Sequence, residues 1–352
     1  MRKMFLMFVV MFVAVAANAG SKEPATVKQF GVPALSQIDF NRLAFASGIN
    51  LFWNSDKNNS QTIESSELIS VGAGSSLAPY VEGGKFTDAF KNAYLKLVDT
   101  KRAEVVRQEL DQSRPAVLVS DFKSLSPNDK KIVGHIVAAS KIIEELYAKQ
   151  EGSLKYLSQI PKDDSLSLAL FYRNQGPWCD APKTQSNPFC NALGSFPEKA
   201  SDAYPEGMKQ DEKMCEDIKK GPNGKELLSP FTVVRRDGGK LVAEPLTSVY
   251  GDQMKIVANE LKAAADLVDA KEAAFKKYLL AAAKGFETNN WDDADESWVA
   301  MNSRNSRWYL RIAPDETYFD PCQEKAGFHT SFAKIDPSSL KWQDSLNPIK
   351  QE

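Results

Sequence analysis

Glu316 and Tyr318, two residues apart near the end of the sequence, combine a carboxylate with a phenol. They follow an aromatic and β-branched stretch, residues 307–313, that predicts a strand, and a Pro-Asp pair at 314–315 that predicts a turn. If the backbone is extended here, both side chains project from the same side. We therefore predict a substrate-binding site for a peptide amine or a backbone amide. The alternative is a turn at a sheet edge with solvated polar groups.

A second polar segment, residues 56–67, follows the twelve-residue calcium-loop (EF-hand) pattern. Calcium prefers hard oxygen ligands, and alternating oxygens can wrap one ion. The predicted ligands are Asp56, Asn58, Ser60, Thr62 through its carbonyl, Glu64, and Glu67 as the bidentate group. Gln61 stands where glycine normally makes the sharp turn, and three carboxylates predict a weak Kd of about 10⁻⁴–10⁻³ M. The alternative is an Asx-rich turn that binds nothing.

The cysteine content predicts two disulfides in an oxidising compartment. The four cysteines are Cys179, Cys190, Cys215 and Cys322. Four cysteines allow three pairings, and their spacing does not choose among them. A zinc cluster is the competing interpretation, but the sequence has no CxxC pair, and His135 and His329 are not spaced as ligands with the cysteines. We interpret His135 as structural.

Residues 1–19 have the pattern of a signal peptide. Arg2 and Lys3 precede an apolar run, and Ala17-Asn18-Ala19 is a small-residue cleavage site that predicts a mature chain beginning at Gly20. The alternative is a membrane anchor. We predict a periplasmic or secreted protein with no membrane partner after cleavage. A formal charge of −2 and the lack of a basic stripe argue against nucleic-acid binding.

Periodicity and turn signals predict an α+β fold that is mostly helical, with short antiparallel strands. We expect an N-terminal helical region over 20–115, which contains the loop 56–67, and a second region over 116–352. Predicted elements of the second region are a buried strand at 116–119, a helix at 127–150, a hairpin at 231–244, helices at 248–268 and 271–287, and the strand at 307–313. The helix start is indicated by the cap and proline at Ser126-Pro127, and the hairpin by Asp237-Gly238-Gly239. The segment 179–221 shows little periodicity.

Several catalytic motifs do not occur in this sequence. It contains no HExxH, no Walker loop, no dinucleotide glycine pattern and no GxSxG. With two histidines far apart in sequence, a Ser/His/Asp or Cys/His site has little material. The residues alone therefore leave open whether the chain is an enzyme.

Short segments in a shared order carry a family resemblance over 125–333. They are Leu125-Ser126-Pro127 with the helix end at 141–150, Asn174-Gln175-Gly176-Pro177-Trp178, Tyr204-Pro205-Glu206-Gly207-Met208, residues 234–241, Tyr278-Leu279, and Glu316-Thr317-Tyr318 followed by residues 325–328. Together they resemble the dipeptidyl peptidase III-like zinc peptidases, including the branch related to Nudix hydrolase 3. The sequence departs from the family at Cys179, where Asp is frequent, and at Leu246, where Tyr is common.

The resemblance implies the N-terminal, substrate-contacting lobe of a two-lobed peptidase. It implies that Glu316 and Tyr318 bind the amino end of a peptide. The family's zinc ligands and catalytic Glu come from an HExxGH helix and a downstream acidic segment, which this sequence does not contain. Because a carboxylate and a phenol orient a peptide but do not make a metal-bound hydroxide, we do not expect this chain to hydrolyse peptides alone. The sequence ends abruptly at Glu352, and we expect either one piece of a split enzyme or a truncated remnant that lost its zinc half. Zinc would then come only with a separately encoded half.

A different class of protein remains as the alternative. The disulfides and the loop 56–67 also suit a calcium-stabilised, disulfide-stapled exported module, with a binding or structural role and no peptide site.

Overall fold

The computed structural model describes residues 25–350, so the predicted signal peptide lies outside the described residues. These residues form two compact units that meet within helix α2, one ending at Lys101 and the other beginning at Arg102. The boundary predicted from the sequence lay at 115/116, just beyond that helix. Among the described residues, no helix is both long enough and apolar enough to cross a membrane.

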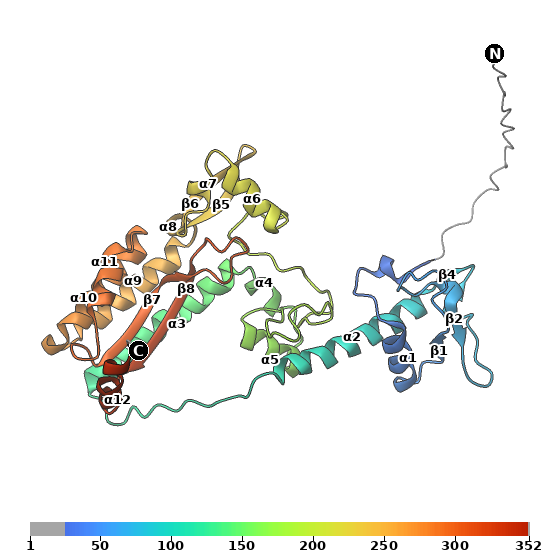
Figure 1. The fold of residues 1–352 in the computed structure, drawn as a ribbon, viewed down its shortest axis with the longest axis horizontal. Helices are drawn as coiled ribbons and strands as arrows, with labels where there is room; N and C mark the ends of the chain where they lie inside the picture. Colours follow the sequence, from blue (N-terminus) through green and yellow to red (C-terminus); the bar gives the residue numbers. More distant parts are fainter. Residues whose placement is uncertain (1–24, 351–352) are drawn as a thin grey trace, which may run out of the picture. The chain divides into compact units, whose positions relative to one another are not determined.

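The first unit combines short helices with two small hairpins (Figure 1). Its elements are η1 (Val27–Phe30), α1 (Gln37–Ala46), β1 (Leu51–Trp53), η2 (Ser65–Glu67), β2 (Leu68–Ser70), β3 (Val81–Glu82), β4 (Lys85–Phe86) and the first part of α2 (Asp88–Leu110). Strand β1 pairs antiparallel with β2, and β3 with β4. Phe86 stacks on Phe90 with ring centroids 4.0 Å apart, and the Tyr94 hydroxyl accepts a hydrogen bond from the Leu35 N–H at 2.9 Å.

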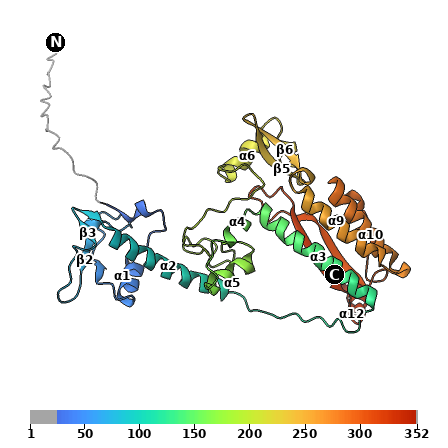
Figure 2. The ribbon, with the colours of Figure 1, turned by 180° about the vertical axis from the view of Figure 1, so that it is seen from behind.

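The second unit contains the larger core, and Figures 1 and 2 show its helices and the β7–β8 ribbon from opposite sides. Its helices are α3 (Pro127–Gln150), α4 (Leu154–Leu157), α5 (Ser165–Asn174), α6 (Glu212–Lys220), α7 (Gly224–Leu227), α8 (Leu246–Val249), α9 (Gly251–Asp266), η3 (Ala270–Glu272), α10 (Ala273–Thr288), α11 (Asp292–Ala300), α12 (Ser339–Leu346) and η4 (Asn347–Ile349). Its strands are β5 (Thr232–Asp237), β6 (Lys240–Pro245), β7 (Trp308–Glu316) and β8 (Gly327–Lys334).

Helix α9 packs against both α3 and α10, and α3 also packs against β8. Fully buried small residues on α9 and α10, among them Ala264, Ala265, Ala282 and Ala283, let these two helices approach closely. All four sheets of the described chain are antiparallel pairs of strands. The predicted fold class, mostly helical α+β with short antiparallel strands, is therefore confirmed.

Three local predictions were wrong. Residues 116–119 form no strand and are exposed. The exposed fractions of Val117, Leu118 and Val119 are 87%, 95% and 87%. The segment 179–221 is not wholly irregular, because Asp211 caps helix α6 by accepting from the Met214 N–H at 2.9 Å.

The third error concerns the predicted turn at 314–315, since β7 continues through these residues to Glu316. Pro314 lies opposite Phe328, whose N–H donates instead to the Gln150 Oε1 at 2.8 Å. A proline is tolerated at a position that the ladder does not use, and a register shift follows between Pro314 and Glu316.

Candidate functional site

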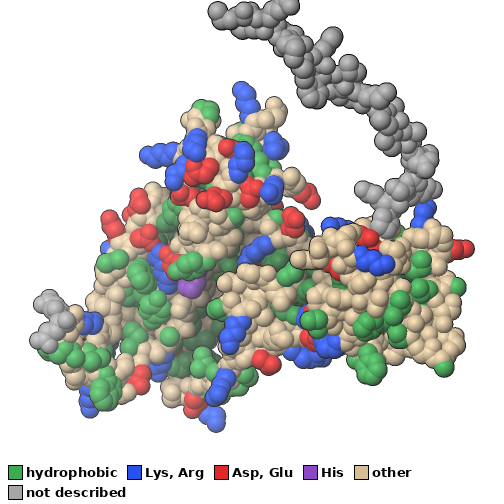
Figure 3. All heavy atoms as spheres, turned by 45° about the vertical axis from the view of Figure 1, so that its right-hand side comes forward, with side chains coloured by type: hydrophobic (Ala, Val, Ile, Leu, Met, Phe, Trp, Pro, Cys, Tyr) green, Lys and Arg blue, Asp and Glu red, His purple; other side chains and the backbone are tan. Residues whose placement is uncertain are grey.

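A cavity of about 780 Å³ lies beside β8 in the larger unit. It is bounded by α3, by β8 and by the β7–β8 connection; the lining residues are Val137, Ser140, Ile143, Glu144, Tyr147, Gln175, Glu316, Tyr318, Phe319, Gly327, Phe328, His329, Thr330 and Phe332. Figure 3 shows hydrophobic side chains and a histidine side chain in a hollow on one face of this unit. The size and mixed lining are typical of a ligand site.

The two residues singled out from the sequence both line this cavity. Glu316 ends β7 and is exposed, and Tyr318 follows in the connection with 86% of its surface exposed. Gly327 lies opposite Glu316, and a Cβ added there would sit 3.1 Å from the Phe319 ring and 3.3 Å from the Glu316 carbonyl oxygen. Any side chain at this position would require the Phe319 ring and the Glu316 carbonyl to shift by a few tenths of an ångström.

The charges around the cavity are acidic. Among its described lining residues, Glu144 and Glu316 are carboxylates, and neither lysine nor arginine contributes. Nearby, the Arg311 guanidinium binds Asp315 at 2.7 and 2.9 Å, and this pairing lowers the pKa of Asp315. A cationic ligand is therefore favoured over an anionic one.

The segment 174–178 lies at one end of the cavity, near the last residues of α3. Gln175 adopts a left-handed conformation with φ 55° and lines the cavity, while its carbonyl accepts from the Ser153 hydroxyl at 2.7 Å. The Asn174 side chain donates to the Trp178 carbonyl at 2.9 Å. A Cβ on Gly176 would lie 3.0 Å from the Trp178 ring, so a side chain at this position would require the ring to shift by a few tenths of an ångström.

Glu151, at the end of α3, is a buried carboxylate beside this segment. Burial raises its pKa to about 7, against the opposing effect of Lys199, whose ammonium lies 3.6 Å away. Its Oε2 has no hydrogen-bond partner. Burial also raises the pKa of Tyr147 to about 12, with Glu151 and Asp180 contributing further.

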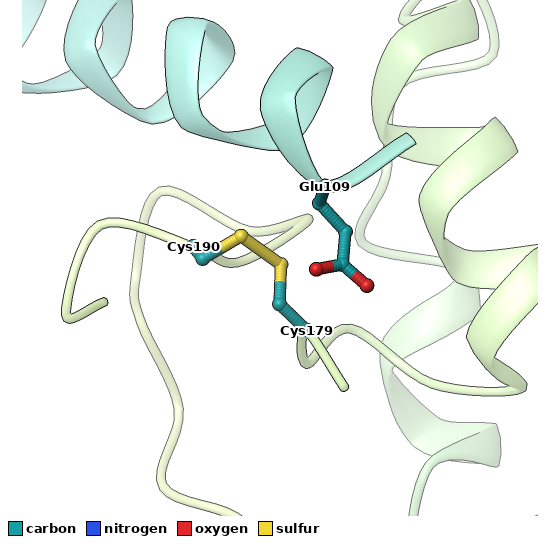
Figure 4. A group of neighbouring side chains, drawn as sticks. All are labelled: Glu109, Cys179 and Cys190. Atoms are coloured by element: carbon teal, nitrogen blue, oxygen red, sulfur yellow. A yellow bond between two sulfur atoms is a disulfide. The ribbon is translucent and has the colours of Figure 1, made fainter. Parts of the chain in front are cut away.

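The structure contains two disulfides, Cys179–Cys190 and Cys215–Cys322. The second ties α6 to the β7–β8 connection that carries Tyr318. The first lies beside Glu109 (Figure 4). The buried Glu109 carboxylate accepts hydrogen bonds from the Ala181 N–H and the Thr184 hydroxyl.

The described residues do not fit a zinc site. Within residues 25–350, one group brings three potential ligand atoms within 4.8 Å of one another, namely Glu109, Cys179 and Cys190 (Figure 4). Those cysteines are joined in a disulfide and offer no thiolate. His135 is engaged elsewhere, with its Nδ1 2.7 Å from a Glu260 oxygen, as its predicted structural role requires.

The loop 56–67 makes its sharp turn without glycine. Gln61 has φ 56°, in the left-handed region, and the Asp56 carboxylate accepts from the Ser60 and Gln61 N–H groups, both at 2.9 Å. The Ser60 hydroxyl donates to the Thr62 carbonyl at 2.9 Å. The turn expected of a calcium loop is thus present, stabilised by side-chain oxygens of the loop itself.

The last predicted calcium ligand, Glu67, is buried and fully engaged. Its carboxylate accepts from the Trp53 indole N–H at 3.0 Å and from the Lys57 N–H at 2.9 Å. The Asn58 side-chain amide donates to Glu64 at 2.7 Å. Calcium at this loop would therefore exchange these hydrogen bonds for metal–oxygen bonds.

The sequence did not point to Glu144, Tyr147, Gln175 or His329 as neighbours of Glu316. They come from α3, from the end of α5 and from β8, and only folding brings them to one cavity. The helical stripe of α3 marks its core face but carries no signal for the polar residues beside it.

The fold is similar to solved structures of dipeptidyl peptidase III. The structure of dipeptidyl-peptidase III from Corallococcus sp. strain EGB is matched over 71% of this chain, with 22% identity and a TM-score of 0.59. That of DPP III from Caldithrix abyssi is matched over 70%, with 26% identity and a TM-score of 0.57. This chain covers 47% and 48% of those chains, about half of their length. No protein-family model and no curated protein matches the sequence.

Proposed function

We propose that this chain binds the amino end of peptides in the cavity between α3 and β8. The observation that carries the proposal is that Glu316 and Tyr318 are both exposed and line one acidic cavity, in a fold similar to that of dipeptidyl peptidase III. The peptidase activity named in those structures belongs to proteins about twice as long as the part this chain covers.

The chemistry of the pair suits a peptide amine. The Glu316 carboxylate accepts from the ammonium group, and the Tyr318 hydroxyl donates to the first carbonyl or accepts from an amide N–H. A hydrogen bond to a charged group contributes about 1.5–3 kcal/mol. Glu144 adds a second negative charge on the α3 side of the cavity.

Binding, and not hydrolysis, is what we propose for this chain on its own. A carboxylate and a phenol orient a peptide but do not generate a metal-bound hydroxide. Zinc chemistry would require ligands from a separately encoded half, which we retain as a proposed partner. Zinc-dependent cleavage of peptides by the purified chain would contradict this proposal.

Calorimetry with a short peptide tests the binding site. We expect the free-amine peptide to bind and its N-acetylated form to bind about tenfold or more weakly, because acetylation removes the charged donor. Glu316→Ala should weaken binding of the free-amine peptide to a similar degree. Glu296→Ala, on an exposed position of α11, is the matched control. Equal affinity of the Glu316→Ala and Glu296→Ala variants would exclude the site.

We also propose export of the chain. Two disulfides favour an oxidising compartment, and residues 1–19 have the composition of a signal peptide. Sequencing the amino end of the chain purified from the periplasm or the medium should give Gly20. A chain that retains residues 1–19 would contradict cleavage.

Calcium binding by the loop 56–67 is the second candidate. The left-handed Gln61 supports it, because that residue makes the turn that calcium loops normally assign to glycine. The engagement of Glu67 by Trp53 and Lys57 opposes it, since those hydrogen bonds must be replaced.

A further inference from the structure

The outer edge of β8 has backbone groups that no strand pairs. Ile312 faces Thr330 across the ladder, and the Ile312 N–H donates away from β8 to the Tyr278 hydroxyl at 2.9 Å. The Phe328 N–H likewise points away from β7, to Gln150. Because inward and outward pairs alternate in an antiparallel ladder, Thr330 and Phe332 also direct their backbone groups outward.

The cavity lies along this part of the edge. Gln150 covers β8 at its start, whereas Thr330 and Phe332 line the cavity with α3 as its other wall. The Thr330 hydroxyl is buried and has no partner within the described chain. An open edge with unpaired amides and carbonyls is a template for an added strand.

The same chain carries an unpaired segment with strand composition. Ala116-Val117-Leu118-Val119 is apolar and largely β-branched, yet it is exposed and has no secondary structure. Figures 1 and 2 draw the α2–α3 connection around it as an extended stretch. Such residues gain most from a pleated, half-buried position.

The α2–α3 connection, residues 111–126, starts near the end of α3 and finishes at the start of α3. At one end, Glu109 of α2 binds Thr184 and Ala181, and the adjoining Asp180 shares Lys199 with Glu151. At the other end, α3 begins at Pro127. The 24 residues of α3 span about 36 Å, and residues 111–126 reach about 50 Å if extended. The connection is therefore long enough to run along the cavity between α3 and β8.

Charge favours one direction of docking. Strand β8 begins near Gln150, at the end of α3. A segment that runs from Arg114 towards the start of α3 at Pro127 therefore lies parallel to β8. With Leu118 beside Ser331, Arg114 falls beside Gly327, the residue paired with Glu316. The exposed Arg114 then meets the acidic end of the cavity, where Glu316 and Glu144 lie.

We propose that the open edge of β8 is a strand-acceptor site and that residues 114–119 of the same chain are the strand it accepts. Docked there, the segment pairs with the outward groups at Thr330 and Phe332 and covers Glu316. One part of this proposal rests on the proposed function: the docked segment competes with peptides for the cavity and so regulates their binding.

Hydrogen–deuterium exchange on the full chain, with disulfides intact, tests the strand directly. We expect the outward amides of Thr330 and Phe332, and amides within the docked segment 116–119, to exchange about tenfold or more faster in Leu118→Asp than in the parent. Arg114→Glu should act in the same direction, and Arg114→Lys should retain the slow exchange. Val299→Asp, which replaces another exposed apolar residue, is the control and should match the parent. Equal exchange at Thr330 and Phe332 in the parent and Leu118→Asp would overturn the proposal.

Dilution and peptide affinity separate the remaining outcomes. Protection that falls on tenfold dilution, together with a dimer mass, would assign the strand to a second copy and overturn the intramolecular proposal. Leu118→Asp should bind a free-amine peptide more tightly than Val299→Asp. If exchange changes as expected but no variant binds peptide, the strand stands and the proposed peptide function fails.

Discussion

The Gln150 carboxamide, at the end of α3, is bonded to both sides of the start of β8: its Oε1 accepts from the Phe328 N–H at 2.8 Å and its Nε2 donates to the Ala326 carbonyl at 3.1 Å. This side chain takes the place of a strand at the point where the cavity begins. It also removes the need for a ladder partner opposite Pro314, which lets β7 extend to Glu316.

Removing this carboxamide should destabilise the larger unit. Gln150→Ala leaves a buried N–H and a buried carbonyl unpaired, which we expect to cost about 2–4 kcal/mol in the free energy of unfolding. Urea unfolding at 25 °C measures it. Gln159→Ala, at an exposed position, should cost little. Equal midpoints for the two variants would show that Gln150 is not needed to anchor β8.

The two disulfides should contribute unequally to stability. Their sequence separations are 107 for Cys215–Cys322 and 11 for Cys179–Cys190. If constraint of the unfolded chain dominates, replacing both cysteines of a pair by Ala should cost about 5 kcal/mol for the first and about 3 kcal/mol for the second. Chemical unfolding of the two double variants compares them. The reverse order would mean that local packing beside Glu109 outweighs chain entropy.

Glu151 should make stability fall as pH rises. Burial raises its pKa to about 7, from 4.5 when solvated, so between these values the folded state holds a proton that the unfolded state has released. The free energy of unfolding should therefore fall from pH 4.5 to 7, by up to roughly 3 kcal/mol. The stability of Glu151→Gln relative to the parent should rise by that amount over this window.

Unfolding midpoints of the two proteins across pH 4–8 provide the measurement. Glu145→Gln, on the same helix and paired with Lys149 at 3.0 Å, is the control. Parallel profiles for the parent and Glu151→Gln would rule out a raised pKa at this carboxylate.

If the loop 56–67 binds calcium, Trp53 should report it. Its indole N–H is bonded to Glu67, and it is the only tryptophan between residues 25 and 101. With a Kd of about 10⁻⁴–10⁻³ M, 10 mM calcium should stabilise the first unit by about 1.4–2.7 kcal/mol and alter Trp53 emission.

Trp53→Phe provides the blank for the other tryptophans, and Asp56→Asn should abolish the response. Identical melting curves and emission in calcium and in chelator would leave the loop as a turn held by Asp56 and Glu67 without metal.

The sequence predicted correctly those elements whose conformation depends on residues within the same short segment. The helix start at Ser126-Pro127 predicted α3 with its observed bounds, because the capping side chain and the fixed proline φ act within one turn. The Asp237-Gly238-Gly239 turn predicted the β5–β6 hairpin, where both glycines have positive φ. The order of short segments likewise indicated the fold that the solved structures share.

Tertiary structure decided what depends on a partner distant in sequence. Residues 116–119 have the composition of a strand, but a strand needs a neighbour, and this structure provides none at that segment. Pro314 lies within a strand because Gln150 satisfies the group opposite it. The pairing of Cys215 with Cys322 follows from contact between α6 and the β7–β8 connection. The cavity around Glu316 follows from contacts between α3, β8 and that connection. Such contacts come from packing between distant residues, which no local pattern encodes.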